Sequence, residues 1–152
     1  MVSVAIALGS NVGDRAAHLH HAVSRLRVPI DNLRVSRFYE TVPVGTPGPQ
    51  ALFLNAALVG ATALPARALL STLLAVEREC GRERAFQNAP RTLDLDLVLF
   101  GASVIDEPDL VDPHPRFRER RFVLEPLAEI ASDMIDPVTG KTVGQLLTLV
   151  IR

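Results

Sequence analysis

One run of ten residues, Arg91-Thr92-Leu93-Asp94-Leu95-Asp96-Leu97-Val98-Leu99-Phe100, is the strongest structural signal in the chain and predicts a β-strand. Successive side chains of a strand point to opposite faces of its sheet. The leucines at 93, 95 and 97 therefore share one face, and Asp94 and Asp96 share the other. The two aspartates are about 6.6 Å apart along the strand. This spacing suits one Mg²⁺ between them or two ions side by side, with substrate phosphates as further ligands.

The same pattern also fits a half-exposed strand whose aspartates simply face water. However, aspartate is depleted in strands, and like charges on one strand face repel each other. Residues 97–100 are apolar on both faces, as in a buried strand, so carboxylates at its start are costly without a partner. Arg91 adds a planar donor group that suits phosphate oxygens. The pattern favours a site for a metal-bound polyphosphate.

The composition is typical of one globular domain. The chain has 152 residues, 48% of them hydrophobic, and a net charge of -1, which argues against a nucleic-acid partner. No apolar run approaches the ~20 residues that span a bilayer, and the N-terminus lacks a basic region followed by an apolar one. Cys80 is the single cysteine, which excludes an internal disulfide. We therefore expect one cytoplasmic domain over residues 1–152, without a membrane partner, as a monomer or alternatively a dimer.

Hydrophobic periodicity predicts the order strand, helix, strand, strand, helix, strand. The strands are expected over 2–8, 33–41, 53–62 and 93–100, and the helices over 15–27 and between Pro65 and Gly81. This order indicates an α/β (α+β) fold of the ferredoxin-like, split βαβ type, with helices packed on one side of a mostly antiparallel sheet. Long loops are expected over 42–50 and 82–91. Beyond the core we expect a short strand at 104–105, a loop over 106–116, and helices over 122–131 and 143–151.

Three further segments carry residues that suit ligand chemistry. Gly9-Ser10-Asn11-Val12-Gly13 joins a strand to a helix, a geometry that suits an anion but equally a structural turn. Residues 113–122 hold His114 and four arginines in six positions, either a solvated basic turn or a flap of donors around a polyphosphate. His18 and His21 lie three residues apart on a helix with no third ligand evident nearby, which favours surface histidines over a zinc site.

Taken together, these motifs resemble the signature of the 6-hydroxymethyl-7,8-dihydropterin pyrophosphokinase family. The resemblance covers nearly the whole chain, with several motifs in the family's order. They are Ala7-Leu8-Gly9-Ser10-Asn11, Phe38-Tyr39-Glu40-Thr41-Val42-Pro43, Phe53-Leu54-Asn55-Ala56-Ala57, Gly81-Arg82-x-Arg84, Pro90-Arg91-Thr92-Leu93-Asp94-Leu95-Asp96-Leu97, Pro113-His114-Pro115 and Phe122-Val123-Leu124-Glu125-Pro126-Leu127.

The resemblance implies a folate-biosynthesis enzyme that transfers the terminal diphosphate of ATP to the pterin hydroxymethyl group, leaving AMP. It implies two Mg²⁺ ions on Asp94 and Asp96. The positions that match catalytic or ATP-binding residues of the family are Glu77, Arg82, Arg84, Arg91, His114 and Arg120. The pterin would lie between Phe53 and Phe122, and the further positions that match its contacts are Gly9, Thr41, Val42, Val44 and Asn55.

The chain departs from the family pattern in the loop before the aspartates, where Asn88-Ala89 stands in place of Trp-Gly. Two other functions share part of the pattern. A nucleotidyl transferase would release diphosphate instead of AMP, and a non-catalytic nucleotide- or pterin-binding module would bind ligand without forming product.

Overall fold

The computed structural model describes residues 1–42, 52–81 and 92–150. Its helices and strands follow the order expected for the core and add further elements after it. In chain order they are β1 (Val2–Ser10), α1 (Arg15–Leu26), β2 (Ile30–Val35), β3 (Tyr39–Thr41), β4 (Phe53–Thr62), α2 (Ala66–Glu79), β5 (Asp94–Phe100), β6 (Ile105–Glu107), β7 (Leu110–Asp112), a short 3₁₀ helix (Phe117–Glu119), α3 (Arg121–Ala131) and α4 (Val143–Leu149).

The main sheet confirms the ferredoxin-like plan. Its strands lie in the order β2-β4-β1-β5, and β3 pairs with β4 beyond the end of β2. All of these pairs are antiparallel. The units β1–α1–β2 and β4–α2–β5 are each split by one strand inserted between their two strands, which defines the split βαβ motif.

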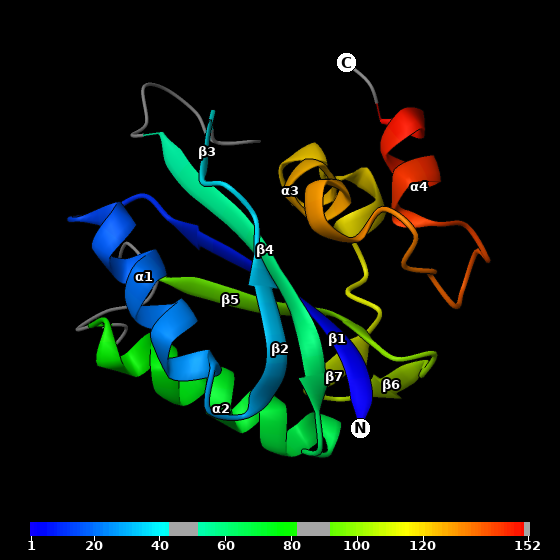
Figure 1. The fold of residues 1–152 in the computed structure, drawn as a ribbon, viewed down its shortest axis with the longest axis horizontal. Helices are drawn as coiled ribbons and strands as arrows, with labels where there is room; N and C mark the ends of the chain where they lie inside the picture. Colours follow the sequence, from blue (N-terminus) through cyan, green and yellow to red (C-terminus); the bar gives the residue numbers. More distant parts are fainter. Residues whose placement is uncertain (43–51, 82–91, 151–152) are drawn as a thin grey trace.

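The helices cover both faces of the sheet, so the expectation of helices on one side is wrong (Figure 1). The core helices α1 and α2 pack on one face against the larger side chains of β1, such as Ile6 and Leu8. The later helices α3 and α4 pack on the other face, over Ala5, Ala7 and Ala57. Because alanines leave little bulk on a strand face, α3 can approach the sheet closely there.

Residues 33–41 do not form one strand as predicted, because the chain leaves the ladder at Ser36. The Ala57 backbone amide donates to the Ser36 hydroxyl over 2.9 Å, and this hydroxyl donates to the Arg37 carbonyl over 2.7 Å. A side chain that bonds to backbone groups in this way competes with regular strand pairing. The segment is therefore divided into β2, which begins earlier at Ile30, and the short β3.

The loop expected over 106–116 is also partly wrong. The strands β6 and β7 form an antiparallel hairpin in which Glu107 pairs with Leu110. The two residues between the strands are Pro108 and Asp109, both typical of tight turns. The strand predicted at 104–105 is confirmed only from Ile105, where β6 begins.

The predicted helix ends agree with the structure to within one or two residues. Asp14 caps α1 by accepting a hydrogen bond from the Ala17 amide over 3.1 Å. Pro65 directly precedes α2, and Gly81 follows it with a positive φ of 82°. Helix α3 begins one residue earlier than predicted, and α4 ends at Leu149. The loop predicted over 82–91 lies outside the described residues, as does all but the first residue of the loop predicted over 42–50.

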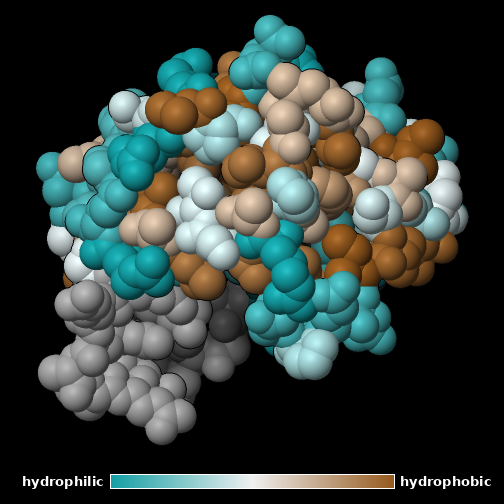
Figure 2. All heavy atoms as spheres, turned by 90° about the horizontal axis from the view of Figure 1, so that it is seen from below, coloured by the Kyte–Doolittle hydropathy of each residue, from teal (hydrophilic) through white to brown (hydrophobic). Residues whose placement is uncertain are grey.

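Among the described residues, no helix is both long enough and apolar enough to cross a membrane. The face seen in Figure 2 carries hydrophobic and hydrophilic residues interspersed with one another. The apolar residues gather instead in the two clusters on either side of the sheet. The stability of the fold therefore rests mainly on burial against the sheet.

Candidate active site

A cavity of about 1010 Å³ lies on the α3 side of the sheet, next to the ends of β1, β3, β4 and β5. The segment from His114 to Val123 supplies another part of its lining. The predicted site residues that line it are Gly9, Thr41, Val42, Phe53, Asn55, Asp94, Asp96, His114, Arg120 and Phe122. The fold therefore brings together residues that lie more than a hundred positions apart in the sequence.

The pairing between the strands determines which residues form the floor of the cavity. Gly9 of β1 pairs with Asn55 of β4 on one side and with Asp94 of β5 on the other. Directly paired residues of antiparallel strands point to the same face of the sheet. Because Gly9 has no side chain, the space between the carboxylate and the amide stays open. An added Cβ atom at Gly9 would come within 3.0 Å of the Asn55 Oδ1 atom.

Asp94 and Asp96 lie on this same face of β5, and both line the cavity. Asp96 pairs with Ala7, whose small side chain leaves room above the strand. Within the described residues, no group of three or more His, Cys, Asp or Glu side chains could hold a metal ion. Two carboxylates nevertheless fit Mg²⁺, which commonly takes one or two carboxylates and completes its shell with water and substrate phosphates. The donor set fits the predicted ion.

His114 lines the cavity, and backbone hydrogen bonds hold both its main chain and its ring. Its backbone amide donates to the Val98 carbonyl over 3.1 Å, which fixes the segment beside β5. The Arg116 amide donates to His114 Nδ1 over 3.2 Å, so a neutral ring carries its proton on Nε2. Burial lowers the pKa of His114, although the nearby Asp96 carboxylate opposes this shift. At neutral pH, His114 therefore offers an Nε2–H donor.

The four arginines after His114 have two different surroundings. Arg116, Arg120 and Arg121 line the cavity, while Arg116 and Arg121 also form exposed ion pairs with Glu119 and Glu125, so both the solvated turn and the flap of donors stay open. Arg118 instead donates from Nε and Nη2 to the fully buried carboxylate of Asp136, over 2.5 and 2.9 Å. The sequence did not point to this pair, because the two residues are 18 positions apart and lie in different local segments.

Aromatic and amide groups also line the cavity, and the Arg120 guanidinium lies 5.6 Å from the centre of the Phe122 ring. Phe53 and Phe122 both line it, from β4 and from the first turn of α3. The amide of Asn55 is buried and donates to the Thr41 hydroxyl. Flat rings and an oriented amide suit a planar heterocycle that carries hydrogen-bonding groups on its edge.

Glu77 does not line the cavity. It lies on α2, its side chain is buried, and its Oε2 atom accepts a hydrogen bond from the Leu95 amide over 2.7 Å. Glu77 thus contacts Leu95, the residue between the two aspartates, from the α2 side of the sheet. Its role in nucleotide binding stays a prediction. The predicted residues Val44, Arg82, Arg84 and Arg91 lie outside the described residues, as does the Asn88-Ala89 substitution.

Several residues line the cavity without having been predicted as site residues. Arg116 and Arg121 belong to the basic segment, so its arginine density was a usable signal. Leu149 and Val150 come from the end of α4 and its cap, and no local motif marks them. Tertiary packing of α4 against α3 brings them to the site.

Comparisons with known proteins show the family of this chain. Residues 5–132 match the model of the 7,8-dihydro-6-hydroxymethylpterin-pyrophosphokinase (HPPK) family. The 2-amino-4-hydroxy-6-hydroxymethyldihydropteridine pyrophosphokinase of Bacillus subtilis is 44% identical over 142 residues, which are 92% of this chain and 84% of that protein. The folic acid synthesis protein fol1 of Pneumocystis carinii is 36% identical over 98% of this chain.

The structural comparison supports the fold. The crystal structure of wild-type Plasmodium falciparum HPPK-DHPS matches 97% of this chain with a TM-score of 0.77 and 13% sequence identity. This chain spans 44% of that chain and 20% of the Pneumocystis carinii protein. The sequence matches and the architecture lead to one conclusion: the chain belongs to the 7,8-dihydro-6-hydroxymethylpterin-pyrophosphokinase family.

Proposed function

We propose that the cavity is the site at which this chain transfers the diphosphate of ATP to the hydroxymethyl group of 6-hydroxymethyl-7,8-dihydropterin, leaving AMP. One observation carries the proposal: a single cavity joins a pair of carboxylates and phosphate-type donors to an aromatic and amide subsite. Family membership supplies the reaction. The two substrates then have separate ends of one cavity.

The pterin occupies the end formed by Phe53, Phe122 and Asn55. The two phenyl rings hold the flat ring system by stacking. Asn55 reads the edge of the ring, because its amide is already oriented by the Thr41 hydroxyl. Gly9 leaves the space into which the hydroxymethyl group reaches toward Asp94. Backbone groups of Val42 and Val44 are proposed to complete this subsite.

The triphosphate of ATP occupies the end that carries Asp94, Asp96, His114 and Arg120. The donors His114 Nε2–H and Arg120 bind phosphate oxygens and hold the chain of phosphates in line with the pterin hydroxyl. Two Mg²⁺ ions bound by Asp94 and Asp96 would neutralise phosphate charge and orient the reacting oxygens. The hydroxyl oxygen forms its bond to the β-phosphorus and releases its proton to solvent, while the bond from that phosphorus to the AMP oxygen breaks and AMP leaves with the electron pair.

We propose further residues that do not line the described cavity. Arg82, Arg84 and Arg91 are then catalytic residues that bind the phosphates, and Glu77 forms part of the nucleotide site. These roles rest on the match of the four residues to the family motifs. The partners are then ATP and the dihydropterin alone. A single domain over residues 1–152, a monomeric state and a cytoplasmic location also stay predictions.

The two aspartates give the sharpest test of this assignment. AMP formation is measured with ATP, 6-hydroxymethyl-7,8-dihydropterin and increasing MgCl₂ for the parent chain, Asp94→Asn and Asp96→Asn. Each substitution keeps the shape and removes one negative charge, so we expect a loss of at least about 100-fold in kcat. Asp106→Asn, an exposed residue of β6, is the matched control and should retain parental activity.

Other results would reject the proposal. Release of diphosphate with transfer of the nucleotidyl group would indicate a nucleotidyl transferase. Ligand binding with no product would indicate a binding module. Full activity in both aspartate variants would place the metal site elsewhere.

A further inference from the structure

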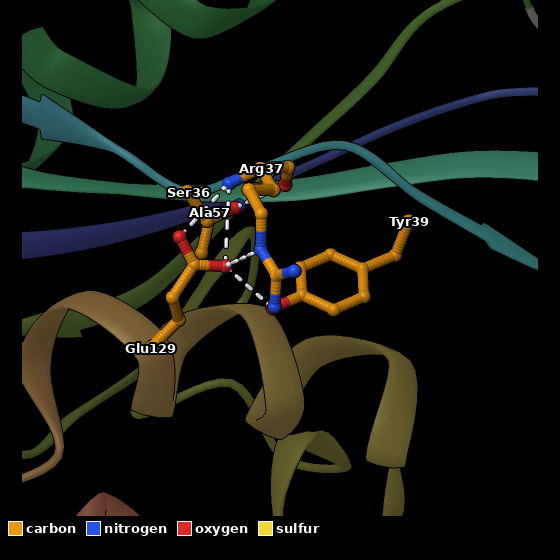
Figure 3. Close-up of polar contacts among 5 residues, drawn as sticks. All are labelled: Ser36, Arg37, Tyr39, Ala57 and Glu129. Atoms are coloured by element: carbon orange, nitrogen blue, oxygen red, sulfur yellow. Dashed lines mark hydrogen bonds and ion pairs between the residues drawn. The ribbon is translucent and has the colours of Figure 1, made fainter.

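One carboxylate of α3 holds the short strand β3 in place (Figure 3). Glu129 accepts hydrogen bonds from the Arg37 backbone amide at 3.1 and 3.3 Å, from Arg37 Nε at 3.2 Å and from the Tyr39 hydroxyl at 2.5 Å. We refer to Glu129, Arg37 and Tyr39 as the α3–β3 clamp. It joins residues that lie 90 and 92 positions apart.

Strand β3, which this clamp holds, is short, so its own pairing with β4 holds it only weakly. β3 has three residues and pairs with β4 through Tyr39↔Asn55, Glu40↔Leu54 and Thr41↔Phe53. A pairing of three residues gives little independent stability. The clamp adds a charged, multiply bonded contact at the beginning of the strand. Thr41, at its other end, lies in the cavity wall.

The clamp also connects the helix that bears Phe122 to the strand that pairs with Phe53, and both of these phenylalanines line the cavity. Phe122 and Glu129 are seven residues apart on α3, which places them on the same face of the helix two turns apart. Phe53 is the register partner of Thr41 on β3. The contact between Glu129 and Tyr39 therefore fixes the helix that bears Phe122 to the strand that is paired with Phe53.

We propose that Glu129 and Tyr39 are positioning residues for the dihydropterin: the α3–β3 clamp sets the gap between Phe53 and Phe122 and keeps Thr41 against the Asn55 amide. This inference rests on the proposed function, since it assigns the pterin to that end of the cavity. It adds two residues that do not line the cavity and act through others. Substrate binding at the phosphate end does not depend on them.

The charges around the clamp keep it formed at neutral pH. The hydrogen bond from the Tyr39 hydroxyl, with those from Arg37, lowers the pKa of Glu129, so this carboxyl group is ionised. Burial and the adjacent carboxylate raise the pKa of Tyr39, so its hydroxyl keeps its proton. The Arg37 guanidinium lies 5.3 Å from the centre of the Tyr39 ring and donates to its hydroxyl over 3.1 Å.

Direct binding measurements on Tyr39→Phe and Glu129→Gln test the proposal. Calorimetry gives the Kd of 6-hydroxymethyl-7,8-dihydropterin in the presence of MgCl₂ and a non-hydrolysable ATP analogue, and separately the Kd of the analogue. We expect both variants to bind the pterin at least about 5-fold more weakly, up to the roughly 100-fold that the loss of a hydrogen bond to a charged group can cost. The Kd of the ATP analogue should stay within about twofold of the parental value.

Glu107→Gln is the matched control, because Glu107 also forms an ion pair with an arginine, Arg67, but lies on β6 outside the cavity. It should leave both Kd values unchanged. Tyr39→Phe keeps the ring and removes a single hydroxyl, so it decides the question if Glu129→Gln fails to fold.

Unchanged pterin binding in Tyr39→Phe would overturn the inference, and so would an equal loss of affinity for both ligands, since that indicates a purely structural role. Absence of pterin binding by the parent chain would instead reject the proposed function.

Discussion

Asp94 and Asn55 lie in one row across the sheet, on either side of Gly9, and all three line the same cavity. The row crosses three strands that are far apart in the sequence. It places a carboxylate that suits a metal ion and an amide that suits a heterocycle on one face, with an open position between them. The chemistry proposed for the site depends on that open position.

Filling this position should impair pterin binding. In Gly9→Ala, the added Cβ atom would lie 3.0 Å from Asn55 Oδ1 and 3.9 Å from the Phe53 ring. The amide must shift to relieve the first contact, so we expect the pterin Kd to rise by about tenfold or more. Titration calorimetry with the pterin and with an ATP analogue measures both affinities. A parental pterin Kd in a folded Gly9→Ala protein would show that this position does not border the substrate.

The buried pair of Arg118 and Asp136 should stabilise the segment that carries His114 and Arg120. Asp136→Asn leaves the Arg118 guanidinium without its counter-charge, so the free energy of unfolding should fall by about 3 kcal/mol at pH 7. Urea denaturation measures this change. The control is Glu125→Gln, which breaks the exposed pair with Arg121 and should cost less than about 1 kcal/mol. Equal effects of the two substitutions would contradict the account.

The same pair predicts a loss of stability in acid. Hydrogen bonds and charge from Arg118, with bonds from Thr139 and Val138, outweigh burial and lower the pKa of Asp136 to about 2. The folded state thus binds this proton less readily than the unfolded chain does. The contribution is present above pH 4 and disappears as the pH falls toward 2, by about 2 kcal/mol. Denaturation curves at stepwise lower pH should show a loss of stability that is smaller in Asp136→Asn than in the parent chain by this amount.

Asp112 predicts a trend of the opposite sign. The residue is 1% exposed, and within the described residues neither carboxylate oxygen has a hydrogen-bond partner of normal geometry, although the Phe100 backbone amide opposes the rise in its pKa. Burial raises the pKa of Asp112 to about 7. Because the folded state then holds the proton more tightly than the unfolded chain, the contribution of Asp112 to the free energy of unfolding should fall as the pH rises from about 4 to 7, by at most about 4 kcal/mol. The difference in the free energy of unfolding between the parent chain and Asp112→Asn should therefore change by this amount across the same pH range, and a constant difference would contradict the assignment.

The core fold and the main ligand groups could be predicted from sequence because their signals are local. Alternation around Asp94 and Asp96 revealed both the strand and its polar face, and the helical spacing of leucines revealed α1 and α2. The ferredoxin-like order followed from the order of these elements. The family resemblance added the further predicted residues that line the cavity, which are Gly9, Thr41, Val42, Phe53, Asn55, Arg120 and Phe122.

Other features could not be predicted because they depend on contacts between distant segments. The division of 33–41 into two strands follows from the bond of Ser36 to Ala57. The hairpin at β6 and β7 was missed because its acidic residues are poor strand formers, although Pro108-Asp109 between the strands is a turn signal. No local sequence pattern indicates the α3–β3 clamp, because Glu129 looks like any other polar residue on a helix.

The most direct test of the central claim follows the β-phosphorus of ATP. ATP labelled at that atom is incubated with MgCl₂, 6-hydroxymethyl-7,8-dihydropterin and the chain, and the products are separated. Transfer of an intact diphosphate predicts that all reacted label is found in the pterin product, in equal amount to the AMP formed. Label in ADP would show transfer of a single phosphoryl group, and label in free diphosphate would show nucleotidyl transfer; either result would contradict the account.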